Sequence, residues 1–446
     1  MPKKILFFLV FIILAVFTFV FSNKTLAATE FVSTIMESGG DYSSLASWEA
    51  AISSSSIDLT TSTTKVFSHS GITGSISDDA LVYGSSSSAM GTAVHVTASQ
   101  ILIKGIYSGT FQSGERVKVN ASNYVTISDA GDSAIATAKI DGAWTNAETS
   151  AVVINGWTTT STNYISVYTT TAARHTGKWD NTKYRLNTAS GVTNLGILEN
   201  YVRIEGLQIG FTNNTSTVTR GIFVVAIDAG GSDIRITNNI VRALDLTSST
   251  ASSTGIYVND ADATVTVINN IVYDFYIAGV GANCYWINSG VVNWYNNTAQ
   301  NCGMAFYQTG GTATSKNDGV ASSTMPFSGT ITETTDSSST PTFVDAANDD
   351  FHLASNDTTW RNVGTDLSAS STDDIDGQTR PTGANTWDIG ADEFVNTAPN
   401  APVSLGQYQS GCSSAISTST YWIATSTICF MGVISDSDLY DLEKLQ

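Results

Sequence analysis

Basic residues are scarce in this 446-residue chain. Lys and Arg number 20 against 39 Asp and Glu, which gives a net charge of −19. No segment concentrates Lys and Arg, so we expect no surface suited to a nucleic-acid backbone. Proline is also rare, with 6 residues, and apolar residues recur regularly, which argues against a disordered chain. The composition therefore predicts a folded protein that does not bind nucleic acid.

Helix-forming residues are equally sparse. Ser, Thr, Asn and Gly are abundant, whereas Lys, Glu and Leu are few. Short apolar segments separated by polar residues are typical of strands joined by turns. We therefore predict an all-β fold.

Long apolar runs are absent beyond the N-terminus. Two lysines precede the run Ile5–Phe21, and the small residues Thr25 and Ala27 precede a cleavage position ahead of Ala28. This order predicts a signal peptide over residues 1–27. The alternative is an uncleaved anchor, because the run is barely long enough to span a bilayer. In both cases we expect a secreted or cell-surface protein with no membrane span in the mature chain.

Cysteine is limited to four residues, Cys284, Cys302, Cys412 and Cys429. In an exported chain, Cys412 and Cys429 can close a disulfide across neighbouring strands. Cys284 and Cys302 are predicted to be buried apolar groups or an optional bridge. Neither pair has the spacing of a metal site, and no histidine cluster lies nearby.

A repeat dominates the middle of the chain. Segments that begin at residues 201, 233, 264 and 291 align without gaps, and each alternates apolar and polar residues. Each then reaches a residue that tolerates a left-handed bend, and these residues are Gly206, Asn238, Asn269 and Asn296. Each copy is therefore predicted to be a strand that ends in a tight bend.

The repeat length is typical of stacked coils. Each interval is too short for a four-stranded propeller blade but fits one turn of a solenoid. Stacking places Ile236 beside Val267 and lets the doubled asparagines bond to one another along the bend. We therefore expect these asparagines to be architectural, with a glycan-binding role as the alternative.

A short helix is predicted before the strands. Asp41 is placed to cap it, and Leu45, Trp48 and Ile52 then fall on one face at helical spacing. An amphipathic helix at this place is expected to cover the open end of the coil stack.

Three of these segments resemble a known family. The coils around "ITNNIV" and "VINNIV" resemble the repeats of the pectin-lyase-like superfamily, and "GGDYSSLASWEAAI" is similar to its N-terminal capping helix. The segment "DIDGQTRPTGANTWDIGADEF" resembles a tail of large exported bacterial β-helix proteins. The resemblance implies a right-handed parallel β-helix over residues 28–395, facing carbohydrate or acting in adhesion. It does not fix an activity.

The residue pattern after the tail differs from that of the coils. Residues 396–446 begin with a proline-bearing linker and continue as alternating strands, which resembles an immunoglobulin-like or fibronectin-like module. Such a sandwich needs about 100 residues, so we expect this segment to be partial.

Catalytic patterns of the family are missing. The sequence has neither the paired arginines around a proline of pectate lyases nor the paired aspartates and histidine of polygalacturonases. The loop "ARHTGKWDNTKYR" nonetheless gathers cations and aromatic rings. Its candidate catalytic residues are Arg174, His175 and Lys178, and its candidate glycan contacts are Trp179, Tyr184 and Arg185. The alternative is a structural loop clamped to the stack.

Aspartates form two further groups. The repeat alignment places Asp228 above Asp262, with Asp233 and Asp260 close in sequence, and such a group can bind Ca²⁺. The alternative for these four is solvated turns. The acidic turns of the tail, which include Asp374 and Asp376, can bind Ca²⁺ but lack the EF-hand spacing, and we expect them to serve as polar caps.

Two functions remain open at this level. The first is a non-catalytic, monomeric β-helix of the cell surface or extracellular space that binds glycans or partner surfaces. The second is a lyase or hydrolase that acts on acidic polysaccharide.

Overall fold

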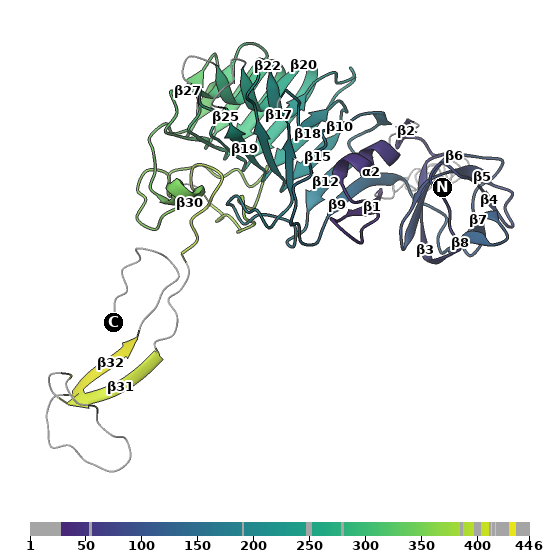
Figure 1. Cartoon of the computed structure of the whole chain (residues 1–446), viewed down its shortest axis with the longest axis horizontal. Coiled ribbons are helices and arrows are strands. Elements are labelled where there is room, and N and C mark those ends of the chain that lie inside the picture. Colours follow the sequence, from purple (N-terminus) through teal and green to yellow (C-terminus); the bar gives the residue numbers. More distant parts are fainter. Residues whose placement is uncertain are drawn as a thin grey trace, which may run out of the picture. The chain divides into compact units, whose positions relative to one another are not determined.

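The computed structural model describes residues 28–52, 56–189, 191–246, 252–277, 281–383 and 387–396, with parts of 403–433. Strands make up most of this structure, as Figure 1 shows. The described residues divide into two compact units, the first formed by residues 28–32, Ser56–Thr137 and Trp157–Tyr164 and the second by the other described residues. Strands β1 (Thr29–Ile35) and β9 (Ala134–Ile140) have residues in both. Within the described ranges, no helix has the length and apolarity needed to cross a membrane.

The first unit contains a closed antiparallel barrel. Its strands, in spatial order, are β3 (Lys65–Thr73), β6 (Gln100–Tyr107), β5 (Met90–Val96), β4 (Leu81–Gly84), β7 (Arg116–Asn120) and β8 (Asn123–Ile127). Phe67, Val82, Val117 and Val125 fill its interior. Beside the barrel, β2 (Ile57–Asp58) pairs in parallel with β11 (Trp157–Thr158).

The barrel corrects the predicted domain boundaries. A β-helix was expected to run without interruption over residues 28–395, but residues 65–127 pair antiparallel with one another. Short turns bring successive strands together as hairpins, and closure buries one face while leaving no free sheet edge. Alternation of apolar residues suits both arrangements, so the sequence pattern did not separate them.

The second unit is a stack of parallel coils with three strand faces (Figure 1). The first face holds β12 (Ile165–Thr169), β15 (Val202–Glu205), β18 (Ile234–Thr237), the C-terminal halves of β20 (Ser253–Ile268) and β22 (Ala282–Tyr295), β25 (Thr312–Lys316) and β28 (Thr332–Thr334). The second holds β13 (Arg185–Thr188), β16 (Gln208–Thr212), β19 (Ile240–Asp245), β21 (Ile271–Tyr273), β23 (Thr298–Gln300) and β26 (Gly319–Ala321).

The third face completes each coil. It holds β10 (Val152–Ile154), β14 (Leu195–Ile197), β17 (Thr219–Val224), the N-terminal halves of β20 and β22, β24 (Met304–Gln308) and β27 (Met325–Ser328). All these pairings are parallel, so the all-β prediction and the parallel β-helix arrangement are confirmed for this unit.

The predicted repeat register is also confirmed. Ile236 of β18 lies opposite Val267 of β20, and Val267 lies opposite Trp294 of β22. The bend residues of the repeat have positive φ angles, namely Gly206 (76°), Asn238 (57°), Asn269 (54°) and Asn296 (52°). Gly and Asn adopt positive φ angles at a low energetic cost, which explains why they occupy this turn.

The second asparagine of each pair forms a buried ladder. Asn239 donates its side-chain amide to Asn270 at 2.9 Å, Asn270 donates to Asn297 at 3.0 Å, and Asn297 donates to Asp318 at 2.9 Å. The same amide groups also donate to backbone carbonyls of the preceding strands, for example Asn270 to Ile236 at 2.8 Å. The amides of Asn239, Asn270 and Asn297 are therefore satisfied by the neighbouring coils.

The N-terminal helix α2 (Leu45–Ile52) forms as predicted, and Leu45, Trp48 and Ile52 are buried. Its cap differs from the prediction. The amides of Leu45 and Ala46 donate to the carboxylate of Glu148, at 3.0 and 2.8 Å, whereas Asp41 accepts a bond from the amide of Thr34. A carboxylate distant in sequence thus serves the helix N-terminus.

The tail covers the outer side of the second face. It contains β29 (Phe343–Asp345), the 3₁₀ turn η2 (Ala346–Asn348) and β30 (Asp350–Leu353). Phe351, Ile375 and Ala391 pack against the side chains of β19 and β21. Arg380 is buried and pairs with Glu393 at 2.8 Å, while it also donates to the carbonyls of Gly390 and Ala391.

The cysteines form two disulfides, Cys284–Cys302 and Cys412–Cys429. The first settles the open choice for Cys284 and Cys302 in favour of a bridge. Near the second, β31 (Val403–Gln409) and β32 (Ile428–Val433) pair antiparallel. The rest of the predicted sandwich module lies outside the described residues, as does the predicted signal peptide.

The asparagine ladder yields a stability prediction. In Asn270→Ala, the amide of Asn239 and the carbonyls of Ile236 and Ile268 lose a buried partner. Since each such loss costs about 1–3 kcal/mol, we expect a destabilisation of about 3 kcal/mol, measured as a lower urea midpoint by tryptophan fluorescence. The control is Asn288→Ala, which breaks an exposed asparagine pair with Asn259 and should cost less than about 0.5 kcal/mol. Equal losses in both variants would contradict an architectural ladder.

Candidate functional site

The basic loop predicted as a catalytic or glycan-binding site is tied to the fold. Arg174 pairs with Glu205 at 2.9 Å, and Lys178 pairs with Asp350 of the tail at 3.4 Å. Gly177 lies so close to His352 that an added Cβ would approach its imidazole to 2.3 Å. The loop therefore serves to hold the tail against the coil stack.

His175 is buried at 2% exposure. Its Nε2 lies 3.0 Å from the carbonyl oxygen of Asn238, and its Nδ1 accepts a bond from the amide of Gly177. Burial, followed by the charge of Arg174, lowers the pKa of His175 to about 3, so the ring is neutral. A neutral imidazole with both nitrogens engaged and no solvent access is poorly placed to act as a base.

The three candidate glycan contacts are placed differently. Tyr184 is fully buried and donates its hydroxyl to Glu148 at 2.9 Å, so it offers no ring face to a sugar. Arg185 is also buried and donates to the carbonyls of Asn181, Lys183 and Thr145. These contacts correct the expectation for both residues, because they stabilise the loop itself. Trp179 is half-buried and packs against the core beneath the tail.

Of the four coil aspartates predicted as Ca²⁺ ligands, Asp233 and Asp260 make side-chain contacts with other groups. Asp233 pairs with Arg203 and Arg235, and Asp260 accepts bonds from the amides of Ile227 and Asp262. In the part of the chain that the structure describes, three acidic or metal-ligating side chains converge elsewhere. The Ca²⁺ prediction for the four stays a prediction.

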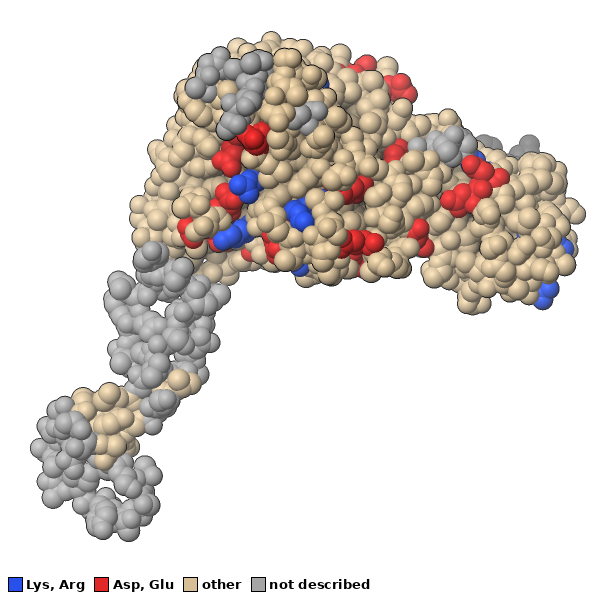
Figure 2. Space-filling view, viewed as in Figure 1, with Lys and Arg blue, Asp and Glu red and all other residues tan. Residues whose placement is uncertain are grey.

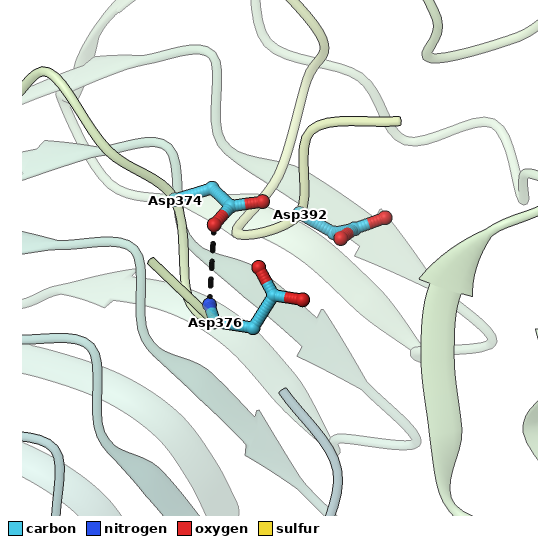
Figure 3. Close-up of side chains that lie close together, drawn as sticks. All are labelled: Asp374, Asp376 and Asp392. Atoms are coloured by element: carbon cyan, nitrogen blue, oxygen red, sulfur yellow. Dashed lines mark hydrogen bonds between the residues drawn. The ribbon is translucent and has the colours of Figure 1, made fainter. Parts of the chain in front are cut away.

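The converging group belongs to the tail. Asp374, Asp376 and Asp392 each offer a carboxylate oxygen, and these atoms lie within 4.8 Å of one another (Figure 3). The turn "DIDG" aims the first two, because the amides of Asp376 and Gln378 donate to Asp374. Asp392 is held by the amide of Leu353 at 2.6 Å.

A cavity of about 390 Å³ opens beside this group. Its polar lining includes His352, Gln378 and Glu393 together with Asp376 and Asp392. Figure 2 shows basic and acidic side chains gathered on the visible surface around β30, the strand that contains His352. His352 binds Asp350 through Nδ1 at 2.6 Å and lies 3.7 Å from Asp376 through Nε2.

Burial shapes the protonation of the cavity. It raises the pKa of Asp374 to about 9, with the nearby Asp376 adding to the effect, and it raises the pKa of Asp392 to about 6. Burial alone would lower the pKa of His352, but the carboxylates of Asp350 and Asp376 outweigh it and raise that pKa to about 11. Burial raises the pKa values of Asp376 and Asp350, but His352 outweighs it and lowers them, so the cavity combines an imidazolium with two ionised carboxylates and the protonated Asp374.

The cluster has the chemistry of a cation site. Carboxylate oxygens are the ligands that Ca²⁺ prefers, and one of them, Asp376 Oδ1, is buried without a hydrogen-bond partner. The residues that would hold the ion are Asp374, Asp376 and Asp392. His352 supplies the compensating positive charge in the absence of a metal ion.

A second feature lies on the outer side of the third face. Phe223, Tyr257, Trp286 and Tyr307 occupy matched positions in successive coils. Their ring centroids are separated by 5.1, 4.2 and 5.6 Å in that order. Tyr257 is buried at 5% exposure, and Phe223, Trp286 and Tyr307 are half-buried. We call these four residues the aromatic ladder.

Neither the cluster of tail aspartates nor the aromatic ladder was predicted from the sequence. The tail aspartates were noticed, but only folding brings Asp392 beside Asp374 and places His352 next to Asp376. The aromatic pairs "FV", "YV", "WI" and "YQ" do recur, yet their alignment depends on loops of unequal length between coils. A search for aromatic residues at outward positions would have found the ladder once the register was known.

Comparisons with known proteins add one likeness. No protein-family model and no curated protein matches the chain. Among solved structures, the chain is similar to "Crystal structure of pectate lyase Pel9A", with 13% identity over 59% of this chain and 88% of that chain and a TM-score of 0.28. Neither activity nor substrate carries over at this level of similarity.

The cavity predicts a pH effect on stability. Asp374, Asp392 and Glu393 have raised pKa values, so their ionisation costs stability as the pH rises above about 4. The raised pKa of His352 acts in the same direction, because its contribution is lost above pH 6.5. We expect a higher Tm at about pH 5.5 than at about pH 8.5, and a weaker pH dependence in Asp374→Asn. Asp366→Asn, at a half-buried position outside the cavity, serves as the control, and a Tm that rises with pH would contradict this prediction.

The cluster also predicts a response to Ca²⁺. At about pH 8.5, Ca²⁺ at about 10 mM should raise the Tm by several degrees, because the ion replaces the lost protons. The increase should disappear in Asp376→Asn and persist in Asp262→Asn. The opposite pattern would place the ion on the coil aspartates instead, and no increase in the native chain would reject both sites.

Proposed function

We propose that this chain is an exported, right-handed parallel β-helix of the pectin-lyase-like kind that binds polysaccharide without cleaving it. It acts as a monomer in the extracellular space or at the cell surface. The observation that carries this proposal is the aromatic ladder on the outer side of the third face.

One end of the aromatic ladder is open. Tyr307 lies opposite the small Ser328 in the following coil, so no further ring covers it. At the other end Phe223 lies opposite Gly196, but the guanidinium of Arg220 lies 4.3 Å from the ring centroid of Phe223. Aromatic faces of this kind contact the apolar faces of sugars, and Tyr and Trp are the residues most enriched at binding surfaces.

Polar side chains run beside the ladder. Trp286 donates its indole NH to Thr309 at 2.9 Å, and Thr309 donates to Asn288 at 2.8 Å. Asn288 in turn donates to Asn259 at 2.8 Å. This exposed row can exchange hydrogen bonds with sugar hydroxyl groups while the rings pack against the sugar.

The contacts of the basic loop favour binding over cleavage. Each of its three candidate catalytic residues contacts another part of the fold, through Glu205, Asn238 or Asp350. The alternative, a lyase or hydrolase acting on acidic polysaccharide, is tested by product release from uronic-acid polymers with and without Ca²⁺. Product release by the native chain that is lost in Lys178→Ala would favour the lyase or hydrolase alternative.

Glycan binding is tested on the ladder itself. Tyr307→Ala removes the end ring and should weaken binding at least about tenfold on a panel of neutral and acidic polysaccharides, measured by affinity electrophoresis. Tyr295→Ala is the matched control, because Tyr295 points outward from the first face, under Lys316. Native chain that binds no glycan, or equal losses in both variants, would overturn the proposal.

A further inference from the structure

The inserted barrel carries a row of outward side chains that the β-helix does not explain. Tyr107 of β6 lies opposite Met90 of β5, and Met90 lies opposite Tyr83 of β4. Tyr83 lies opposite Lys118 of β7, and Lys118 lies opposite Tyr124 of β8. These five residues, the barrel row, cross five adjacent strands.

Strand alternation places the row on the outside. In β4, Val82 is buried while Leu81 and Tyr83 are 50% and 36% exposed, and Tyr107 at the other side is 50% exposed. In β7 and β8, Val117 and Val125 fill the interior. At about 4.8 Å per strand, the row is roughly 19 Å long, enough to contact several units of an extended polymer.

Two cations lie on these rings. The guanidinium of Arg116 sits 4.3 Å from the ring centroid of Tyr124, and the ammonium of Lys118 sits 5.2 Å from that of Tyr83. Such contacts fix the direction of both side chains at the surface and leave their N–H groups able to bind an anion.

The other basic groups of the barrel are already neutralised or bound. Lys104 pairs with Asp79 at 3.5 Å, His95 contacts Asp78 at 2.8 Å, and Lys65 donates to the carbonyl of Gly131. Among the described residues, no carboxylate lies within ion-pair distance of Arg116 or Lys118. Within the barrel, Arg116 and Lys118 therefore lie on neighbouring rings without an acidic partner.

We propose that the barrel row and Arg116 form a binding site for an anionic polysaccharide, separate from the aromatic ladder. The tyrosine rings pack against sugar rings, and Arg116 and Lys118 pair with the carboxylate or sulfate groups of the polymer. The excess of acidic residues in the chain repels anions, so we expect an anionic polymer to bind where such cations lie beside rings. The site stands without the proposed function, because no residue of the ladder takes part.

The test uses the full-length chain and the double variant Arg116→Gln/Lys118→Gln. The probes are polygalacturonate, dextran sulfate and neutral dextran, with oligothymidylate as the nucleic-acid probe, in affinity electrophoresis at two salt concentrations. We expect the native chain to bind at least one polyanionic glycan, and the double variant to bind it at least about tenfold more weakly. The two glycans distinguish carboxylate from sulfate.

The control removes the same charge elsewhere. Lys104→Gln/Lys139→Gln deletes two lysines that are held by Asp79 and Asp141, and it should retain native affinity. Tyr83→Ala in the full chain tests the rings and should also weaken binding. Equal losses in both double variants, unchanged affinity in the first, or stronger binding of oligothymidylate than of either glycan would overturn the proposal. If Tyr307→Ala weakens glycan binding at the aromatic ladder but leaves polyanion binding at the barrel unchanged, the two sites are independent.

Discussion

The coil stack depends on the satisfaction of buried polar groups by neighbouring coils. A bend in the backbone removes amide and carbonyl groups from strand pairing, and burial makes an unpaired group costly. The ladder of Asn239, Asn270 and Asn297 fills these gaps, since each side chain bonds to the coil on either side. A shift of one residue would break every one of these bonds, so the ladder fixes the register.

The asparagine ladder ends in carboxyl groups. Asp318 accepts from Asn297 and from the hydroxyl of Ser315, and its own amide donates to Asp336. Burial raises the pKa of Asp318, and it raises the pKa of Asp336 to about 6. In the tail, buried charges are paired with opposite charges instead. Arg380 pairs with Glu393, and His352 contacts Asp350 and Asp376. The acidic cavity is thus a consequence of covering the second face with a charged tail.

Fixed register has an effect on the outer surface too. Inward residues that stack in the core require their outward neighbours to stack as well, so one aromatic residue per coil becomes the ladder from Phe223 to Tyr307. The barrel row arises by another route, because antiparallel pairing aligns Tyr83, Lys118 and Tyr124 across strands. In both cases the buried face determines which exposed residues meet.

The sequence by itself determined the strand content, the repeat register, the left-handed bends and the N-terminal helix. These follow from local rules, since alternation and the tolerance of Gly206 and Asn238 for positive φ act within a few residues. Tertiary structure alone decided the barrel, the cap of α2 by Glu148, the burial of His175 and Tyr184, and the meeting of Asp374 with Asp392. Each of these joins residues that are distant in sequence, and apolar alternation carries no information on which distant strand or loop becomes the partner.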